Sequence, residues 1–420
     1  MSWLRRVTID LTPLLPGGEN GGAKLVARAL VQHMAALSPQ TEFTLLTSLA
    51  NHADCADLEA ANVRRACVEL EAPRGTLAAV RVAARLSINT LVPTRIRTRL
   101  KDRLWVALKR QRRAAAMSTT ALADVLVCPF TAPYFFDPRV PLVSLVHDIQ
   151  YLEMPQFFSA ALTSQRHQNF VDACQKADLL ICVSDFVRAT VQRQGRVPRE
   201  RTLTIHSTVL RGQAAPPGSA PFRSPYLLYP ANVWPHKNHE RLLEAFARFI
   251  ASNRDSTLAL VCTGAPGAAA DELCERARAL LPDQRFAFLG FLSETAFDAV
   301  MQNCRALIFP SLYEGFGLPI LEAMAADRPV MCSNVTSLPE VAGDAALMFD
   351  PYDVGPIANA IQRLEREPEL ESTLVQRGRE RVATFGTPSE WAARYLDAFE
   401  DVIRCRASKA AVASSQSQPR

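Results

Sequence analysis

Residues 306–325 read ALIFPSLYEGFGLPILEAMA, and this stretch decides the predicted fold. The run at residues 306–311 is apolar and bounded by turn residues, which is typical of a buried parallel strand. A turn with two glycines and the start of a helix follow. In parallel sheets, ligands bind at the carboxyl ends of the strands, where a helix N-terminus presents free amides to an anion. With Glu314 before the turn and Glu322 in the helix, the stretch suits a phosphate flanked by hydroxyl groups, as in a sugar nucleotide.

The same alternation of strands and helices extends over most of the chain. In the first half, helical patterns at residues 22–37 and 158–177 lie between apolar strand-like runs. A segment rich in proline, glycine and alanine, residues 211–225, has the composition of a linker. Strand-like and helical runs then alternate again up to residue 350. Strands that alternate with helices predict parallel sheets with right-handed crossovers.

We therefore predict an α/β protein with two Rossmann-like domains and a cleft between them. The predicted divisions are residues 1–210 for the first domain, 211–225 for the linker, 226–388 for the second domain, 389–405 for an amphipathic helix and 406–420 for a disordered tail.

The composition is that of a globular protein that can form two cores. The chain has 420 residues, of which 48% are hydrophobic and 21% are charged. Its ten cysteines show no CxxC pair, so we expect buried thiols, no structural disulfides and a reducing cytoplasmic setting. We find no targeting segment and no apolar run long enough to span a membrane.

The stretch EGFGLPILEAMA at residues 314–325 resembles the E-x7-E signature of retaining glycosyltransferases with the GT-B fold, of the glycosyltransferase family 4 type. The similarity continues through PEVAGDAALMFDPYD at residues 339–353 and, more loosely, over the N-terminal half. The resemblance implies two Rossmann-like domains whose parallel sheets face each other across a cleft. It also implies transfer of a sugar from a nucleoside diphosphate to an acceptor hydroxyl, with retention of the anomeric configuration.

By this resemblance, Glu322 binds the ribose hydroxyls of the donor, and Glu314 faces the sugar ring near the reacting carbon. The amides of Phe316, Gly317 and Leu318 would line the sugar and the diphosphate. The residue types suit these roles, because an ionised carboxylate only accepts hydrogen bonds and glycine permits close backbone approach. The alternative is an ordinary Gly-Pro turn with two solvated glutamates.

A second element, WPHKN at residues 234–238, follows the first strand of the second domain. A lysine at a helix start can bind a phosphate as a point charge. The resemblance implies that Lys237 binds the donor diphosphate. The family pattern commonly has an arginine where this chain has Asn232, so His236 or an arginine from elsewhere would have to compensate. The alternative for Lys237 is a solvated lysine. The segment resembles a subset associated with bacterial surface-polysaccharide assembly, including mannosyl- and rhamnosyltransferases.

The glycine-rich loop PGGENGGAKL, residues 16–25, follows a strand and opens a helix, as a phosphate-binding loop does. It matches neither a Walker A motif nor GxGxxG. In the family, a glycine pair at this helix start lies beside the donor diphosphate and the acceptor, and Gly21 and Gly22 fit that position. A flexible β–α turn is the alternative.

Two further strand ends carry candidate residues. VHD at residues 146–148 resembles the family segment whose histidine faces the donor sugar, so His147 can stabilise a hydroxyl or developing charge and Asp148 can orient it. A purely structural histidine is the alternative. Ser184 and Arg188 resemble the family's serine-led turn beside the donor phosphates or the acceptor.

Basic residues are concentrated between Arg74 and Arg113. This stretch contains twelve Lys or Arg and a single acidic residue, Asp102, whereas the formal net charge of the whole chain is only +5. In GT-B enzymes with lipid-linked acceptors, a basic and apolar patch of the first domain often docks on membranes. The stretch, which includes Trp105, is either a site for an anionic membrane surface or a solvated insertion beside the acceptor cleft. We expect no nucleic acid partner, because no binding motif accompanies the charge.

The function predicted from the sequence is retaining transfer from a nucleotide sugar, GDP-mannose as first choice, to a lipid-linked or polysaccharide glycan acceptor. Glu314, His147 and Lys237 are the predicted catalytic residues, and no metal or other cofactor is expected. The setting would be cytoplasmic, with peripheral attachment to the inner face of the cell membrane as an option. Two alternatives stay open: a nucleotide-sugar epimerase on the same fold and a non-catalytic sugar- or nucleotide-binding protein.

Overall fold

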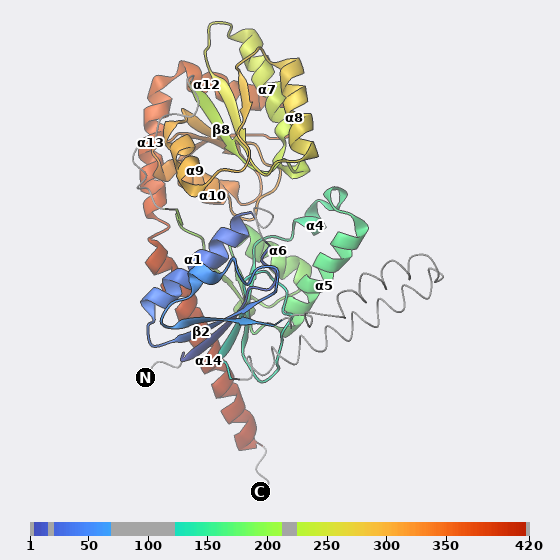
Figure 1. Cartoon of the computed structure of the whole chain (residues 1–420), viewed down its shortest axis with the longest axis vertical. Coiled ribbons are helices and arrows are strands. Elements are labelled where there is room, and N and C mark those ends of the chain that lie inside the picture. Colours follow the sequence, from blue (N-terminus) through green and yellow to red (C-terminus); the bar gives the residue numbers. More distant parts are fainter. Residues whose placement is uncertain (1–3, 16–20, 69–121, 212–224, 417–420) are drawn as a thin grey trace, which may run out of the picture.

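The structure is a computed structural model that describes residues 4–15, 21–68, 122–211 and 225–416, with side chains described as far as residue 409. Two α/β domains lie one above the other, with the first domain at the bottom of Figure 1 and the second at the top. The basic stretch at residues 74–113 and most of the linker fall outside the described residues. The predictions about membrane docking and about the linker therefore stay predictions.

The first domain is built on a seven-stranded sheet in which every strand pair is parallel. The strand order is β3-β2-β1-β4-β5-β6-β7. The central strands β4, β5 and β6 are buried and almost entirely apolar, which is the pattern that parallel sheets require because helices cover both faces. The strands are β1 (Arg6–Asp10), β2 (Glu42–Thr47), β3 (Val63–Cys67), β4 (Val125–Cys128), β5 (Leu142–Val146), β6 (Leu179–Cys182) and β7 (Thr202–Thr204).

The described helices of this domain follow the strands as crossovers. They are α1 (Gly22–Leu37), α4 (Gln150–Glu153), α5 (Ala160–Lys176) and α6 (Asp185–Gly195), with short 3₁₀ turns η1 (Ala56–Leu58), η2 (Pro155–Phe157) and η3 (Arg199–Arg201).

The second domain has a six-stranded sheet in the order β10-β9-β8-β11-β12-β13, again with parallel pairs throughout. Its strands are β8 (Tyr226–Pro230), β9 (Ala259–Thr263), β10 (Phe286–Phe288), β11 (Ala306–Phe309), β12 (Val330–Ser333) and β13 (Ala346–Phe349). Its helices are α7 (His239–Ser252), α8 (Ala268–Leu280), α9 (Glu294–Asn303), α10 (Leu318–Ala325), α11 (Leu338–Ala342), α12 (Val354–Arg366) and α13 (Pro368–Ala383), with the 3₁₀ turn η4 (Pro235–Lys237). The predicted α/β class with two Rossmann-like sheets is confirmed.

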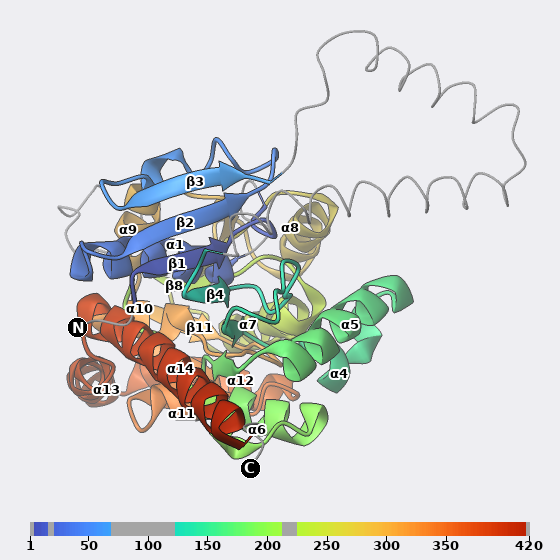
Figure 2. The same cartoon turned by 90° about the horizontal axis from the view of Figure 1, so that it is seen from below.

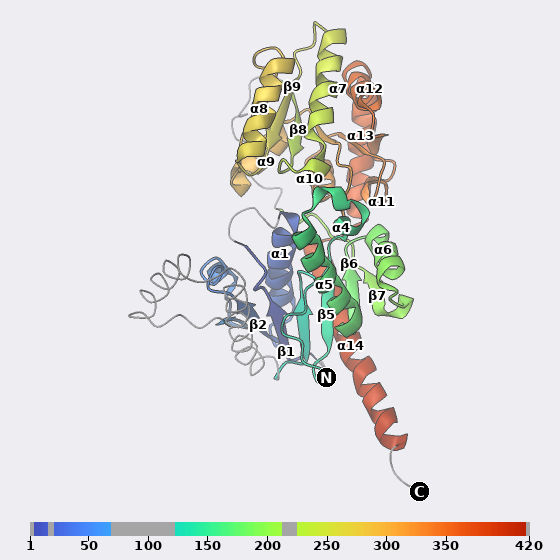
Figure 3. The same ribbon diagram turned by 90° about the vertical axis from the view of Figure 1, so that its right-hand side faces the viewer.

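The last helix, α14 (Pro388–Gln416), returns from the second domain and lies along the first (Figures 2 and 3). Trp391, Tyr395 and Phe399 follow each other at a spacing of four residues, so they form one stripe that is buried in the core of the first domain. Burying each of these side chains contributes about 1.5–3 kcal/mol to stability. The sequence predicted a disordered tail from residue 406, but the helix continues to Gln416. The stretch is rich in alanine, the residue with the highest helix propensity.

Within the described residues, no helix combines the length and the apolar composition needed to cross a membrane. All ten cysteines are free thiols, and Cys128, Cys182 and Cys262 are buried in strands as expected.

Candidate active site

A cleft of about 1170 Å³ lies between the domains, where the carboxyl ends of both sheets face each other. Loops that follow β4 and β5 line it from the first domain, and loops that follow β8, β10 and β11 line it from the second. Most of the residues singled out from the sequence lie on its walls, namely Gly21, Gly22, His147, Asp148, Asn232, His236, Lys237, Glu314, Phe316, Gly317, Leu318 and Glu322. The fold thus brings together residues that are distant in the sequence.

Lys237 and Glu314 form an ion pair on the second-domain wall. Lys237 Nζ donates to Glu314 Oε1, and both side chains are only 13% exposed. Lys237 ends the η4 turn, one residue before Asn238, whose buried amide donates to the carbonyl oxygens of Pro310 and Pro351 at 3.0 and 2.8 Å. The loop that carries Lys237 is therefore fastened to the end of β11. The pair places one cation and one carboxylate side by side in a largely desolvated part of the cleft, where charges interact strongly.

The turn at residues 314–317 depends on its two glycines. Gly317 has φ +109°, a conformation that L-residues with side chains rarely adopt, and it precedes the first turn of α10. A Cβ on Gly315 would lie 1.8 Å from the carbonyl oxygen of His147 in the other domain. The Ser337 hydroxyl lies 3.0 Å from the carbonyl oxygens of both Glu314 and Phe316. The turn is thus fixed within its own domain and touches the first domain directly.

Glu322 lies deeper in the cleft, on α10, with its side chain 8% exposed. Burial raises the pKa of Glu322, and the nearby Arg211 guanidinium acts in the opposite direction. Arg211 Nε is 3.5 Å from Glu322 Oε1, and the guanidinium lies over the Phe297 ring at 4.1 Å from its centroid. Among the described residues, the buried Nε and one terminal nitrogen of Arg211 have no hydrogen-bond partner.

Arg211 is a site residue that the sequence did not reveal. It stands at the first position of a segment rich in proline and glycine, where local composition indicates only a spacer. Its place beside Glu322 results from the path of the chain between the domains, and no local signal could have found it.

His147 follows β5 on the first-domain wall. Its Nε2 lies 2.7 Å from the carbonyl oxygen of Pro129, which can only accept, so Nε2 carries the proton and Nδ1 is an acceptor. Burial lowers the pKa of His147, so the ring is neutral at physiological pH. Asp148 accepts from the Gln150 amide at 3.1 Å and lies 3.9 Å from Arg166. The Pro129 carbonyl therefore orients the His147 ring. Asp148, which the sequence suggested for this role, instead contacts the Gln150 backbone amide and Arg166.

Gly21 and Gly22 open α1 opposite the E-x7-E turn. Gly21 has φ +52° and precedes the first helical residue. A Cβ on Gly22 would come within 3.3 Å of the Leu318 side chain, so the N-termini of α1 and α10 approach each other across the cleft. Two helix N-termini that face one space favour an anion there.

Asn232 and His236 do not supply the missing cation. The Asn232 side-chain oxygen accepts from the Ala265 amide at 2.7 Å and thereby holds the loop after β9. Burial, followed by the charges of Lys237 and Arg166, lowers the pKa of His236 to about 3, so this ring is neutral. The cleft instead receives guanidinium groups from other elements, Arg166 of α5 and Arg211.

Ser184 and Arg188 lie away from the cleft surface. The buried Ser184 hydroxyl donates to the Gly315 carbonyl oxygen at 2.7 Å and accepts from the Val187 amide, so it joins α6 to the E-x7-E turn. Arg188 Nε donates to the Thr202 hydroxyl at 3.1 Å, which ties α6 to β7. The geometry gives Ser184 a contact between domains and gives Arg188 a contact within its own domain.

One group in the described part of the chain, Asp185, His206 and Glu340, brings three metal-capable atoms within 4.8 Å. Hydrogen bonds already engage Glu340 Oε1 and Oε2 and Asp185 Oδ1. The expectation that no metal is required stays a prediction.

Comparisons with known proteins agree with this geometry. Residues 217–381 match the model of the family described as glycosyl transferases group 1. Over 257 residues, the chain is 31% identical to O-antigen chain mannosyltransferase B of Escherichia coli, a match that covers 58% of this chain and 67% of that protein. It is also 29% identical to the serotype-specific mannosyltransferase WbdA of Escherichia coli, with 53% of this chain covered but only 28% of the relative.

The fold is shared with the crystal structure of Anabaena HepE in complex with UDP and glucose. The TM-score is 0.67 at 18% identity, and the alignment covers 94% of this chain and 100% of the other. Two parallel sheets that face each other across a cleft, the family match and the extended sequence identity lead to one conclusion. The chain belongs to the group 1 glycosyl transferases and is a glycosyltransferase.

Proposed function

We propose that this glycosyltransferase moves mannose from GDP-mannose to a hydroxyl of a surface-polysaccharide glycan, with retention of the anomeric configuration. The observation that carries the proposal is the ion pair of Lys237 and Glu314 in a largely desolvated part of the cleft, opposite a neutral His147. This arrangement offers a cation for a leaving diphosphate and a carboxylate for a sugar that becomes positively charged in the transition state.

The donor diphosphate would lie between the N-termini of α1 and α10. The amides of Gly21, Gly22 and Leu318 would donate to its oxygens, and Lys237 would balance its charge. Because amides and cations can neutralise the phosphates, we propose that no metal is needed. Lys237 would then exchange part of its contact with Glu314 for the phosphate, which leaves the carboxylate for the sugar.

The ribose would lie against Glu322, whose ionised carboxylate accepts paired hydroxyl hydrogen bonds. Arg211 supports this role because its guanidinium favours the charged form of the buried carboxylate. Among the described residues, one terminal nitrogen of Arg211 has no hydrogen-bond partner, so it can donate to the nucleotide.

The chemical step would break the bond between the anomeric carbon and the phosphate oxygen and form the bond to the acceptor oxygen on the same face. The proton of the acceptor hydroxyl would pass to the departing phosphate oxygen. A neutral His147, with Nδ1 as acceptor, can hold a sugar hydroxyl but is a weak base because its pKa is lowered. The site therefore suits a mechanism in which the leaving group, not a side chain, takes the proton.

The choice of mannose and of a polysaccharide acceptor rests on the two Escherichia coli mannosyltransferases. The HepE complex contains UDP and glucose, so UDP-glucose is the donor to test beside GDP-mannose.

The test is turnover of GDP-mannose, measured by NMR in the presence of a lipid extract from bacteria that make mannose-containing O-antigen. We expect α-linked mannose in the lipid fraction and release of GDP. A product formed from the donor alone would favour an epimerase, and β-linked product would contradict retention.

A variant Glu314→Ala separates an enzyme from a binding protein. We expect it to keep GDP affinity within about threefold and to lower kcat about 100-fold or more, because the carboxylate acts mainly in the transition state. Unchanged turnover in this variant would refute the role of Glu314.

A further inference from the structure

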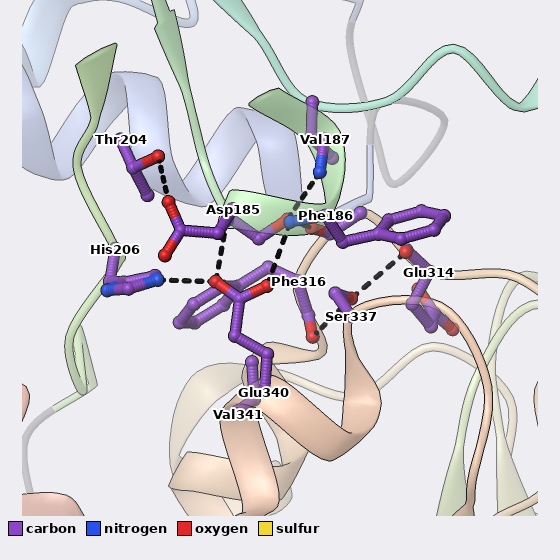
Figure 4. Close-up of polar contacts among 12 residues, drawn as sticks. Asp185, Phe186, Val187, Thr204, His206, Glu314, Phe316, Ser337, Glu340 and Val341 are labelled. Atoms are coloured by element: carbon purple, nitrogen blue, oxygen red, sulfur yellow. Dashed lines mark hydrogen bonds and ion pairs between the residues drawn. The ribbon is translucent and has the colours of Figure 1, made fainter. Parts of the chain in front are cut away.

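A carboxylate of the second domain, that of Glu340, caps the N-terminus of a helix of the first domain (Figure 4). Glu340 of α11 accepts from the backbone amide of Asp185 at 2.6 Å through Oε1 and from that of Phe186 at 2.9 Å through Oε2. His206 Nε2 lies 2.5 Å from Oε1 of the same carboxylate. Among the described residues, the Glu340 carboxylate therefore has three hydrogen-bond partners, and all three belong to the first domain.

The capped amides belong to the first turn of α6, where they have no partner within the helix. A carboxylate at a helix N-terminus also gains from the helix dipole. Burial acts to raise the pKa of Glu340, but the hydrogen bonds from His206 and from the Asp185 and Phe186 amides outweigh it, and the pKa is lowered. The ionised form is thus the one that this contact between the domains favours.

Both sides of this contact reach the turn that carries Glu314. On the α11 side, the Ser337 hydroxyl lies 3.0 Å from the Glu314 and Phe316 carbonyl oxygens. On the α6 side, Ser184 directly precedes Asp185 and donates to the Gly315 carbonyl oxygen at 2.7 Å. The turn is therefore held between two elements that Glu340 fastens to each other.

We propose that Glu340 is a positioning residue that latches the two domains together and thereby sets Glu314 opposite His147. Glu340 does not line the cleft, so it acts through the turn and not on the substrate. This role explains why both oxygens of the Glu340 carboxylate bind the other domain, although Glu340 has no place in the proposed donor-binding site. Its kinetic consequence rests on the proposed function.

Asp185, His206 and Glu340 are also a possible metal-binding group by distance. Both Glu340 oxygens accept from backbone amides, and Asp185 Oδ1 accepts from the Thr204 hydroxyl at 2.6 Å. Both carboxylate oxygens of Glu340 and Oδ1 of Asp185 thus already accept hydrogen bonds within the protein, which favours a hydrogen-bonded latch.

The structural test uses hydrogen exchange of the full chain with and without GDP. In Glu340→Ala, we expect the amides at the start of α6 to exchange about tenfold faster or more, because each loses a charge-assisted hydrogen bond. The control is Glu380→Ala, which removes an exposed carboxylate from the same domain and should leave α6 protection unchanged. Equal protection in wild type and Glu340→Ala would overturn the latch, as would loss of wild-type protection on treatment with EDTA.

The kinetic test asks whether the latch serves catalysis or only folding. We expect Glu340→Ala to lower kcat about tenfold or more while the Kd for GDP and the melting temperature stay close to those of wild type. Glu340→Gln should be intermediate, because one amide oxygen can replace only one of the two acceptors. A kcat that is unchanged, or that falls equally in Glu380→Ala, would refute the positioning role. If wild type does not use GDP-mannose, the proposed donor fails, but the exchange experiment still decides the latch.

Discussion

Replacing Gly315 by alanine should push the two domains apart at the turn that carries Glu314, without changing any side chain that faces the donor. The added Cβ would lie 1.8 Å from the His147 carbonyl oxygen in the opposite domain. A carbon–oxygen contact requires about 3.3 Å, so the two backbones must separate by about 1.5 Å. A displacement of about 1 Å at reacting groups can lower a rate about 100-fold, and we therefore expect kcat to fall by about that factor.

The assay is GDP-mannose turnover together with calorimetric titration of GDP. The Kd for GDP should change by less than about threefold, because the second domain holds most of the proposed nucleotide contacts. Gly355→Ala is the matched control, since its Cβ would meet Asp353 Oδ1 at 3.4 Å, an ordinary contact. A Gly315→Ala variant that keeps wild-type kcat would refute the argument that domain contact at this turn positions the catalytic groups.

Two further predictions concern stability. Burial raises the pKa of Asp10 from its ordinary value of 3.8 to about 7, so the folded state holds a proton that the unfolded state releases, and stability should fall as the pH rises from about 4 to about 7. Asp10→Asn should remove this decline and be more stable than wild type at pH 8 by up to about 4 kcal/mol. The measurement is the melting temperature of both proteins at pH 5 and pH 8. A difference between the two proteins that is the same at both pH values would contradict this. Trp391→Ala should cost about 3–5 kcal/mol because the indole is fully buried between α14 and the first domain, whereas Tyr352→Ala, at an exposed position, should cost little in the same urea titration.

The central architecture could be predicted from the sequence because most buried parallel strands are short apolar runs that differ from the longer helical patterns. The edge strands β3 and β7 cannot be recognised from the sequence. β3 carries two arginines, Arg64 and Arg65, and β7 has only three residues, so neither shows the apolar run that identifies a central strand. Their strand conformation comes from pairing with β2 and β6.

The candidate site was predictable where a local motif carries it, as with Glu314, Glu322 and Lys237. Residues that act through tertiary contacts were not. Arg211 lies in a segment with linker composition, and the link between Glu340 and α6 joins residues that are far apart in the sequence. A sequence motif consists of residues that are neighbours in the chain, whereas these contacts depend on how the two domains pack against each other.

The central claim is that the cleft binds a nucleoside diphosphate through Lys237. It is tested most directly by calorimetric titration of wild type and Lys237→Ala with GDP, UDP, dTDP and ADP. We expect wild type to bind one of the four nucleotides, with GDP as the first choice. The variant should bind this nucleotide at least about tenfold more weakly, because it loses a charge-assisted contact. Failure of all four nucleotides to bind wild type, or equal affinity in the variant, would contradict the account.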